Sequence, residues 1–458
     1  MGEQRGGMQN PGKTSSNVTD MTTGSTLRHL LLFALPMLIG NIFQQLYNLA
    51  DAIIVGRFIG AEAFAAVGAT SSITFFFFAL CNGFGSGGGI VVSQFYGAHD
   101  EESVKSCIIN TGLLMLFVPV VFGTLGFVLA PALLRVLDTP AAILQDAIVY
   151  TRFMCVGLLF VSLYNFIASM LRALGDSRTP LYFLIFSTLV NIVLDVLFVC
   201  VLSMGIVGAA GATVVSQLIS VVACGIYARK TNPYFRFGKK EITFLPDMAA
   251  RIIRLGVPMS LQFGLIAISS MAVQRIVNAY GTVVVAAFTA TNRIEQVIHQ
   301  PYMTLGASLS TYTGQNYGAR HRERVVRGYR TSLFVMAGLT VVLVLMMQLF
   351  GRAITAVFVK DADVITLGAL GLKINSAFYL ALGMIYVIRG ILTGLGDAFF
   401  PLFNGVVEVI GRFTLPLLMT AYLGFGETGI WLSCGIVWFL SGFTAWLRYR
   451  SFFRRLQF

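Results

Sequence analysis

Charge is what this sequence has least of. Only 11% of its 458 residues are Asp, Glu, Lys or Arg, whereas 56% are hydrophobic. A soluble globular protein carries about 25% charged residues. Several apolar runs are almost without charge over about 18 residues or more, the length that spans a bilayer core about 30 Å thick. The sequence therefore excludes a soluble protein and predicts an all-α polytopic membrane protein.

Clustered cysteine and histidine are also missing. The six cysteines stand singly, without a CxxC pair, at Cys81, Cys107, Cys155, Cys200, Cys224 and Cys434. A disulfide framework or a zinc site needs clustered spacing, so we expect these side chains to act as small hydrophobic groups. The four histidines form no HExxH motif, and no GxSxG motif occurs. The sequence therefore does not predict an enzyme.

A nucleotide-binding signature is absent as well. The glycine run Gly83, Gly85, Gly87, Gly88 and Gly89 lies inside an apolar stretch and lacks the Lys-Ser/Thr of a phosphate-binding loop. We expect it to allow close helix packing. The sequence thus predicts no ATP, no nucleic-acid partner and no cofactor. Any energy-driven transport would use an ion gradient.

What the sequence does contain is a set of twelve apolar segments, each long enough for a transmembrane helix. They lie near 28–50, 63–93, 106–130, 143–171, 181–203, 207–228, 255–279, 283–315, 330–350, 364–393, 399–422 and 428–447. We predict an N-lobe at 27–228 (helices 1–6) and a C-lobe at 255–450 (helices 7–12). Residues 1–26 are expected to be a disordered cytosolic tail, 229–254 a basic cytosolic linker, and 451–458 a second cytosolic tail.

The two halves resemble each other in sequence. A shift of 221 residues places 94–98 (QFYGA) on 315–319 (QNYGA), and 174–176 (LGD) on 395–397 (LGD). An even number of spans separates equivalent positions, so both copies enter the membrane in the same direction. We therefore predict two six-helix bundles related by a parallel internal repeat. In transporters with such repeats the substrate site lies between the halves.

Lysine and arginine indicate the orientation. They gather in the connection after the sixth span, in the one after the eighth, and at the C-terminus. The residues are Arg229, Lys230, Arg236, Lys239, Lys240, Arg251, Arg254, Arg320, Arg322, Arg324, Arg327, Arg330, Arg448, Arg450, Arg454 and Arg455. The positive-inside rule then places both termini in the cytoplasm of a multi-pass protein of the cell membrane. The net charge of +12 reflects this topology and an attraction to membrane lipid.

Two carboxylates lie inside predicted spans of the first half. Asp51 shares a helix face with Gln44 and Tyr47, and Asn191 stands one turn before Asp195. Burial and a second carboxylate nearby both favour the neutral form of a carboxyl group, so such a pair suits proton exchange. The same oxygens are also hard ligands for Na+. The alternative is that Asp51 is merely solvated at the outer interface beside Arg57.

The second half carries different charges. Glu295 and His299 share a helix face, and we expect them to line a substrate cavity, with a satisfied polar contact as the alternative. Glu408 and Arg412 have the i,i+4 spacing of an ion pair, whether structural or functional. The absence of matching acids in the two halves suggests that ion coupling belongs to the N-lobe.

Taken together, these motifs resemble the multidrug and toxic-compound extrusion (MATE) family over residues 27–450. The matching residues are Pro36, Ala50-Asp51 with Val55-Gly56, the segment 94–98, 171–176 with Pro180, and 389–397 with Pro401. The resemblance implies two six-helix bundles around a central cavity. It also implies export of cationic or amphipathic compounds in exchange for protons or sodium ions.

Within this family the chain looks more like the DinF-related branch than the NorM-related branch. The DinF-related pattern implies a cation site at Asp51, Gln44, Tyr47, Asn191, Asp195, Thr213 and, as a weaker match, Asn165. The NorM-related branch has acids at positions that correspond here to Ile266 and Phe378. The resemblance leaves H+ and Na+ open as coupling ions, and it implies no other metal.

We therefore expect a cation-coupled antiporter that exports small organic compounds by alternating access and functions as a monomer. The alternative is a flippase for lipid-linked precursors on the same superfamily fold. A flippase needs a strongly basic groove for phosphate. Cationic residues inside the predicted spans are few, chiefly Arg275, Arg293 and Arg412.

Overall fold

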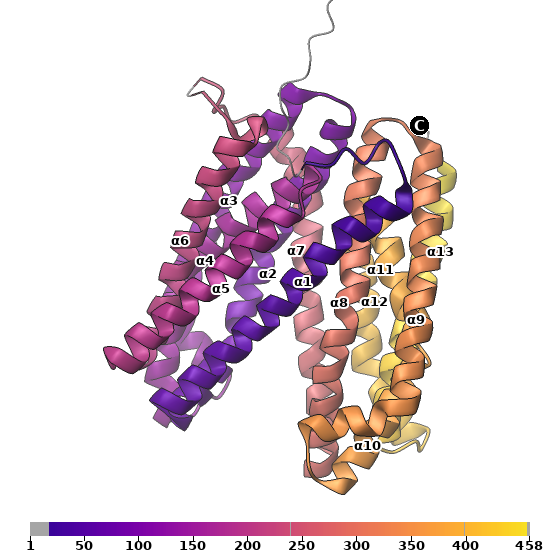
Figure 1. Ribbon diagram of the computed structural model, residues 1–458. Coiled ribbons are helices and arrows are strands. Elements are labelled where there is room, and N and C mark those ends of the chain that lie inside the picture. Colours follow the sequence, from indigo (N-terminus) through magenta and orange to yellow (C-terminus); the bar gives the residue numbers. More distant parts are fainter. Residues whose placement is uncertain (1–17, 239, 398, 456–458) are drawn as a thin grey trace, which may run out of the picture.

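The structure, a computed structural model, describes residues 18–238, 240–397 and 399–455, and every regular element in this part is a helix (Figure 1). The first half contains α1 (Thr26–Ile54), α2 (Ala61–Gly97), α3 (Glu101–Val136), α4 (Ala141–Ala173), α5 (Arg178–Asp195) and α6 (Gly205–Thr231). The second half contains α7 (Pro246–Asn278), α8 (Thr282–Gly318), α9 (Arg322–Phe358), α10 (Ala362–Ser376), α11 (Tyr379–Gly394), α12 (Phe399–Leu417) and α13 (Thr428–Arg455). Three π-helical turns, η1 (Val55–Ile59), η2 (Val196–Val201) and η4 (Leu418–Tyr422), continue α1, α5 and α12, and a 3-10 turn, η3 (Pro233–Phe235), follows α6.

The number of membrane spans depends on two features of the second half. Ten described helices are long and apolar enough to cross a membrane, or eleven if α10 and α11, bent by 52° at a short break, form one span. The 37-residue helix α8 is not among them. Its middle carries the polar side chains Arg293, Glu295, Gln296, His299 and Gln300. The chain is thus a multi-pass, all-α membrane protein, and the count of twelve spans stays a prediction that depends on α8.

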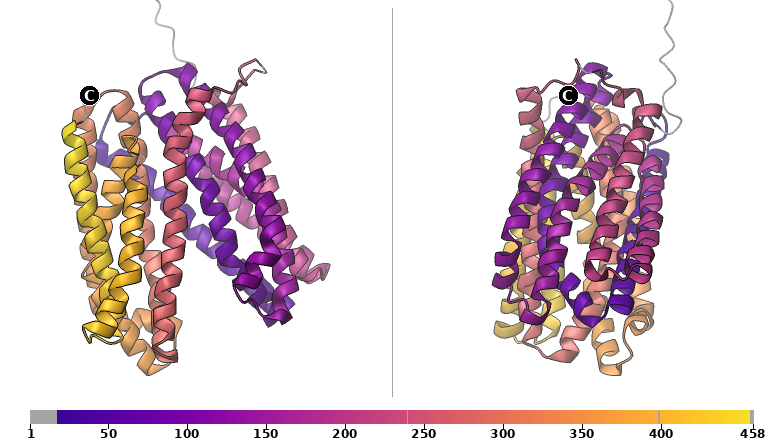
Figure 2. Two further views of the ribbon diagram at one scale, coloured as in Figure 1. Left: turned by 180° about the vertical axis from the view of Figure 1, so that it is seen from behind. Right: turned by 90° about the vertical axis from the view of Figure 1, so that its left-hand side faces the viewer.

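The helices form two bundles that approach each other at one end and diverge toward the other (Figures 1 and 2). The close end carries both described termini and the α6–α7 connection. Helix α1 runs diagonally across the bundles, with contacts to α8 and α9 on one side and to α5 on the other. Helix α7 similarly contacts α2 and α12, so two helices join the bundles.

Glycines allow the close approach of the helices around α2. A Cβ atom at Gly83 or Gly87 would collide with the backbone of α7 near Gly256. Gly88 and Gly89 face the side chains of Thr111 in α3 and Ser169 in α4 in the same way. The prediction that this glycine run serves helix packing is therefore confirmed.

The contacts that close the bundle end are reciprocal. Gly97 of α2 packs on the carbonyl of Gln315 in α8, and Gly318 of α8 packs on the carbonyl of Gln94 in α2. The side-chain amide of Gln94 donates to the Gly394 carbonyl at 3.0 Å, and that of Gln315 donates to the Ala173 carbonyl at 3.0 Å. In both cases the equivalent partners are 221 residues apart, which is the shift found in the sequence.

The N-terminal segment differs from expectation. The prediction of a disordered tail at 1–26 is wrong for residues 18–26, and residues 1–17 lie outside the described part. Met21 is only 1% exposed, and its N–H donates to Gln315 Oε1 at 3.0 Å. Its carbonyl accepts from Asn316 at 3.1 Å and from Arg324 at 2.9 Å. The segment is ordered because α8 and α9 satisfy its backbone polar groups.

Two helix boundaries also differ from the predicted ones. Helix α6 continues to Thr231 and α7 begins at Pro246, so the connection is shorter than the predicted linker 229–254. Helix α13 continues to Arg455 instead of ending at 450. In both places basic residues continue an apolar helix beyond its hydrophobic stretch. A helix boundary predicted from hydropathy alone therefore falls short of the real one, because the helix itself does not end where its apolar residues end.

Candidate ion and substrate site

The most unusual group in the first half is the pair Asn191 and Asp195 at the end of α5. Both side chains are fully buried. Neither the carboxylate oxygens of Asp195 nor the amide atoms of Asn191 have a hydrogen-bond partner in the described chain. Buried polar side chains are nearly always paired. These four unpaired polar atoms, on side chains one helical turn apart, have the chemistry to accept a proton or to bind a cation.

Residues from two other helices, α1 and α6, lie close to this pair. Asp51 of α1 lies close enough to Asp195 for the two carboxylates to repel each other. Tyr47, one turn before Asp51, interacts with Thr213 of α6 and lies within electrostatic range of both acids. The structure thus brings together Asp51, Asp195, Asn191, Tyr47 and Thr213, which the family resemblance implied.

Tyr150 of α4 is a member of this site that sequence reasoning missed. It is 7% exposed and lies within electrostatic range of Asp51, Tyr47 and Asp195. A single tyrosine in an apolar span gives no charge signal. Only the packing of α4 against α6 and α2 brings it to the carboxylates.

Two of the expected residues have weaker ties to the site. Gln44 lies on the same face of α1 as Tyr47 and Asp51, is partly exposed, and has no recorded hydrogen bond in the described residues. The amide of Asn165 donates at 2.8 Å to the Val161 carbonyl of its own helix. No recorded bond of the described chain joins Asn165 to Asp195, so its membership stays a prediction.

Both acids lie within one helical turn of the start of a π-helical segment. Asp195 ends α5 and is followed at once by η2, and Asp51 lies one turn before η1. Such turns are rare, and they occur frequently at functional sites, where they interrupt the regular hydrogen-bond ladder. The regular α-helix therefore ends at Asp195 in α5 and three residues after Asp51 in α1.

A cavity of about 540 Å³ opens beside Asp51. Polar groups on its wall include Asp51, Thr213 and Gln217, while Phe64, Phe75 and Phe78 supply aromatic surface. Arg293 reaches it from α8, so both bundles contribute to the wall. A partly apolar cavity of this size with a few polar groups suits a small organic molecule.

Glu295 and His299 make polar contacts inside the second bundle, which was the alternative to a cavity lining. Glu295 is 6% exposed, and its Oε1 accepts from Tyr379 at 2.9 Å and from Asn375 at 3.2 Å. His299 Nε2 lies 3.8 Å from Glu295 Oε2, and His299 Nδ1 lies 3.3 Å from the Tyr386 hydroxyl. Neither residue lines the 540 Å³ cavity. This face of α8 packs against α10 and α11, and a place of the two residues in a substrate cavity stays a prediction.

The ion-pair partner of Glu408 is not Arg412, which its i,i+4 spacing had suggested. Glu408 forms its ion pair with Arg389 of α11 at 3.1 Å, and not with Arg412. Arg389 also donates to Asn404 at 2.6 Å, and in the amide orientation that satisfies both groups it donates to Gln262 at 2.8 Å. Arg412 instead donates to Ser269 at 3.4 Å. Residues from α7, α11 and α12 thus form a polar cluster inside the second bundle.

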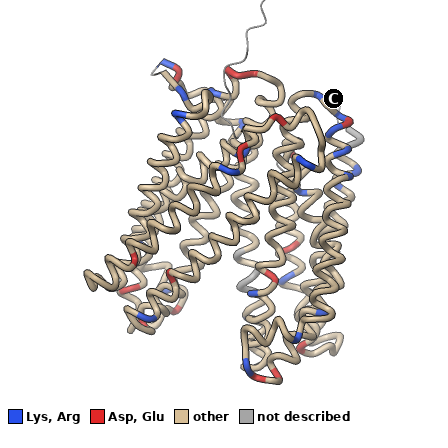
Figure 3. Tube along the Cα trace, viewed as in Figure 1, with Lys and Arg blue, Asp and Glu red and all other residues tan. Residues whose placement is uncertain are grey.

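Charged residues gather at the two ends of the bundles, with a small group at mid-height of the second bundle (Figure 3). Within the described residues no group of three or more His, Cys, Asp or Glu is arranged to hold a metal ion. The six cysteines are free, and four of them are buried.

Known proteins with this architecture resemble the chain over nearly its full length. The MatE family model matches residues 36–197 and 258–416. "Probable multidrug resistance protein YpnP" of Bacillus subtilis is 32% identical over 94% of this chain and 96% of its own length. YoeA of the same organism, also named a probable multidrug resistance protein, is 28% identical over 89% of this chain and 90% of its own. A solved outward-facing MATE family transporter has a TM-score of 0.89 at 23% identity, covering 96% of this chain and 98% of that one.

The fold and these matches define a membrane transporter and not an enzyme. The family model covers well over half of the residues, and one relative exceeds 30% identity over nearly the whole length. The chain belongs to the MATE family.

Proposed function

We propose that this protein is a multidrug exporter that exchanges small organic compounds, cationic or amphipathic, for H+ or Na+. The observation that carries this proposal is that Asp195 and Asn191 are buried and have no hydrogen-bond partner in the described chain. They lie close to Asp51, and Asp51 lines the 540 Å³ cavity. A proton or a sodium ion would remove one of the two negative charges and so relieve the repulsion between the carboxylates. Two relatives named as multidrug resistance proteins support a substrate of this class.

Helix α1 connects ion binding to the movement of the bundles. It carries Asp51 and Tyr47 toward α5 and α6, while its other side contacts the second bundle. Asn41 donates to Gln300 at 2.9 Å, and the Leu30 carbonyl accepts from Ser308 at 3.0 Å. A change at Asp51 that shifts α1 therefore alters contacts with α8, which allows one bundle to rock against the other.

We also propose twelve spans in a parallel repeat, with both termini in the cytoplasm and the bundles diverging toward the outside. The family model matches two segments of similar length, which begin at 36 and 258. The reciprocal bonds of Gln94 and Gln315 support the same repeat. Acids at Asp51 and Asp195, with Ile266 and Phe378 in the second half, support the DinF-related branch.

The test compares Asp51→Asn and Asp195→Asn in a cell that lacks its own drug pumps. We expect each variant to lose at least tenfold in gradient-driven efflux, because Asn cannot exchange a proton and lacks the charge that binds Na+. Efflux under an imposed pH gradient or an imposed sodium gradient identifies the coupling ion.

The control is Asp138→Asn, which removes an exposed carboxylate in the α3–α4 turn at a backbone angle that Asn tolerates. It should transport like the unchanged protein at equal amounts in the membrane. Full efflux by both site variants would contradict the coupling role of this pair. Translocation of a lipid-linked precursor in proteoliposomes without drug efflux would favour a flippase instead.

A further inference from the structure

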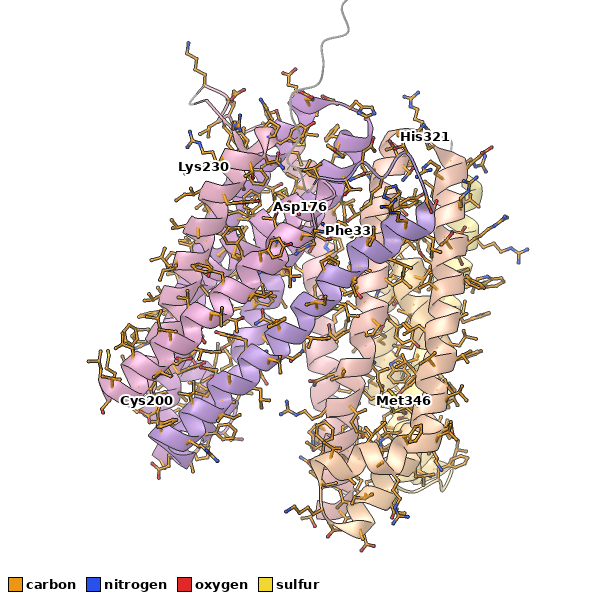
Figure 4. The ribbon with its side chains drawn as sticks, viewed as in Figure 1. Phe33, Asp176, Cys200, Lys230, His321 and Met346 are labelled. Carbon is orange, nitrogen blue, oxygen red and sulfur yellow. The ribbon has the colours of Figure 1, made fainter. Side chains whose placement is uncertain are left out.

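A second cavity lies at the close end of the bundles, away from the site just described. It has a volume of about 370 Å³ and is formed by the N-terminal segment, the first turns of α1 and the α4–α5 turn. We call Thr19–Ser25 the strap and this cavity the strap pocket. Figure 4 labels Phe33, which lines the pocket, and Asp176, which adjoins it, near the starts of α1 and α5.

The strap pocket is lined by cations that form no ion pair with the described residues. Arg28 of α1 and Arg178 of α5 both line it and are exposed, and His29 adds a third basic side chain. Neither arginine side chain has an ion pair or a hydrogen bond to any part of the chain that the structure describes. Two unpaired guanidinium groups on one small cavity are typical of a site for a phosphate group.

The nearby Asp176 lies within electrostatic range of Arg178 but forms no ion pair with it. Asp176 is 2% exposed, and its carboxylate accepts from the backbone N–H groups of Arg178 and Thr179 at 3.1 and 2.9 Å and from the Thr179 hydroxyl at 2.6 Å. Asp20 accepts from the N–H and hydroxyl of Thr22 at 2.8 and 2.6 Å. Both carboxylates thus accept hydrogen bonds from neighbouring residues of their own turns, and neither lines the pocket.

Further hydrogen-bond donors face the same space. Ser177 lines the pocket, is only 5% exposed, and its hydroxyl has no recorded partner in the described chain. Ser25, which also lines it, precedes α1 without forming a side-chain cap bond. The first N–H groups of α1 therefore remain available beside it, and such groups favour an anion.

The other side of the pocket is apolar. Leu32 is 48% exposed and Phe33 is buried, and both line the pocket. Leu31 and Leu35 of α1 are also exposed, at 44% and 54%, and in a membrane they would face lipid chains. A ligand with a phosphate group attached to hydrocarbon chains matches both sides of this pocket.

We propose that the strap pocket binds the phosphodiester headgroup of an anionic phospholipid, with Arg28 and Arg178 pairing with the phosphate. The lipid chains lie along Leu32 and the exposed face of α1. The strap is joined to the second bundle through Met21 and Gly24, whose carbonyls accept from Arg324 at 2.9 Å each. Bound lipid therefore holds the strap in place and stabilises the closed end of the transporter.

The test uses the purified full-length protein in detergent with phosphatidylglycerol, phosphatidylcholine or inorganic phosphate as the probe. We expect phosphatidylglycerol to bind and to raise the unfolding temperature. Arg28→Gln/Arg178→Gln should weaken that binding at least tenfold. The matched control, Arg320→Gln/Arg327→Gln, removes two exposed arginines outside the pocket and should bind like the unchanged protein.

A second measurement follows the accessibility of the strap. If the double variant does not fold, the single variant Arg178→Gln takes its place. A cysteine replacing the exposed Thr23 is labelled with a membrane-impermeant maleimide. Phosphatidylglycerol should slow the labelling in the unchanged and control proteins and not in the pocket variant. Equal lipid binding by pocket and control variants would overturn the proposal. Full competition by inorganic phosphate at equal concentration would overturn its assignment to lipid.

Discussion

At the scale of single residues, two buried acids illustrate how the surroundings decide a role. One carboxylate oxygen of Glu295 has two donors, since Tyr379 and Asn375 both donate to Oε1, whereas its Oε2 has no hydrogen-bond partner in the described chain. Asp195 is equally buried and has no donor within the described chain. A carboxylate with fixed partners stabilises the bundle that supplies them. A buried carboxylate without partners among the described residues is free to bind a proton or a cation, and this supports the coupling role proposed for Asp195.

The Arg389–Glu408 pair provides a prediction at the same scale. Glu408→Ala should destabilise the protein by about 3–5 kcal/mol, because it leaves the Arg389 charge in a largely buried cluster without its counter-ion. Thermal unfolding in detergent measures the effect as a lower unfolding temperature. Glu427→Ala removes an exposed acid of the same half and serves as the control. Equal unfolding temperatures for the two variants would show that the pair contributes nothing.

At the scale of helices, the approach of α2 to α8 is the contact that closes one end of the molecule. It depends on Gly97 and Gly318, each of which faces a carbonyl of the other helix. Because the two contacts are reciprocal, neither helix can shift along the other without disturbing both of them. The two Gln–carbonyl bonds of 3.0 Å lie beside these glycines and add directionality.

Gly97→Ala and Gly318→Ala should therefore both weaken the closed end, although alanine is the better helix former by about 1 kcal/mol. We expect lower unfolding temperatures for both variants and of similar size. Gly338→Ala in α9, where a Cβ atom meets nothing within 4 Å, should be neutral or stabilising. A loss confined to one of the two glycines would contradict the reciprocal role.

At the scale of the whole molecule, the strap is the part of the N-terminal segment that joins the two bundles. Gly175 of the first bundle packs against the backbone of Thr19. Arg324 of the second bundle donates to the carbonyls of Met21, Thr23 and Gly24 at 2.9–3.0 Å. Opening this end during transport therefore requires the strap to leave at least one bundle.

Arg324→Gln should shift the protein toward a state that is open at this end, because it removes the three guanidinium bonds to the strap. Spin labels at Lys230 and His321, which lie on different bundles at this end (Figure 4), report the change as a longer distance. Arg327→Gln, an exposed position on the same helix, is the matched control. An unchanged distance distribution in Arg324→Gln would rule out a closing role for these bonds.

The sequence alone determined the class of protein, the 221-residue correspondence and the acids of the first half. These features depend on hydropathy, spacing and residue type, which are local properties of a chain. The packing role of the glycine run also followed from its composition. Hydropathy was less reliable at α8, because a membrane helix can carry polar residues where it faces a cavity, as at Arg293, or the inside of a bundle, as at Glu295.

Only the tertiary structure decided which helix faces pack against each other. It placed Tyr150 beside Asp51, turned Glu295 toward α10 and α11, and gave Glu408 the partner Arg389 instead of Arg412. It also ordered residues 18–25, whose polar sequence suggested disorder, by satisfying their backbone from α8 and α9. Each of these contacts joins residues far apart in sequence. Their partners depend on the rotation and depth of packed helices, which the spacing of residues along one helix does not specify.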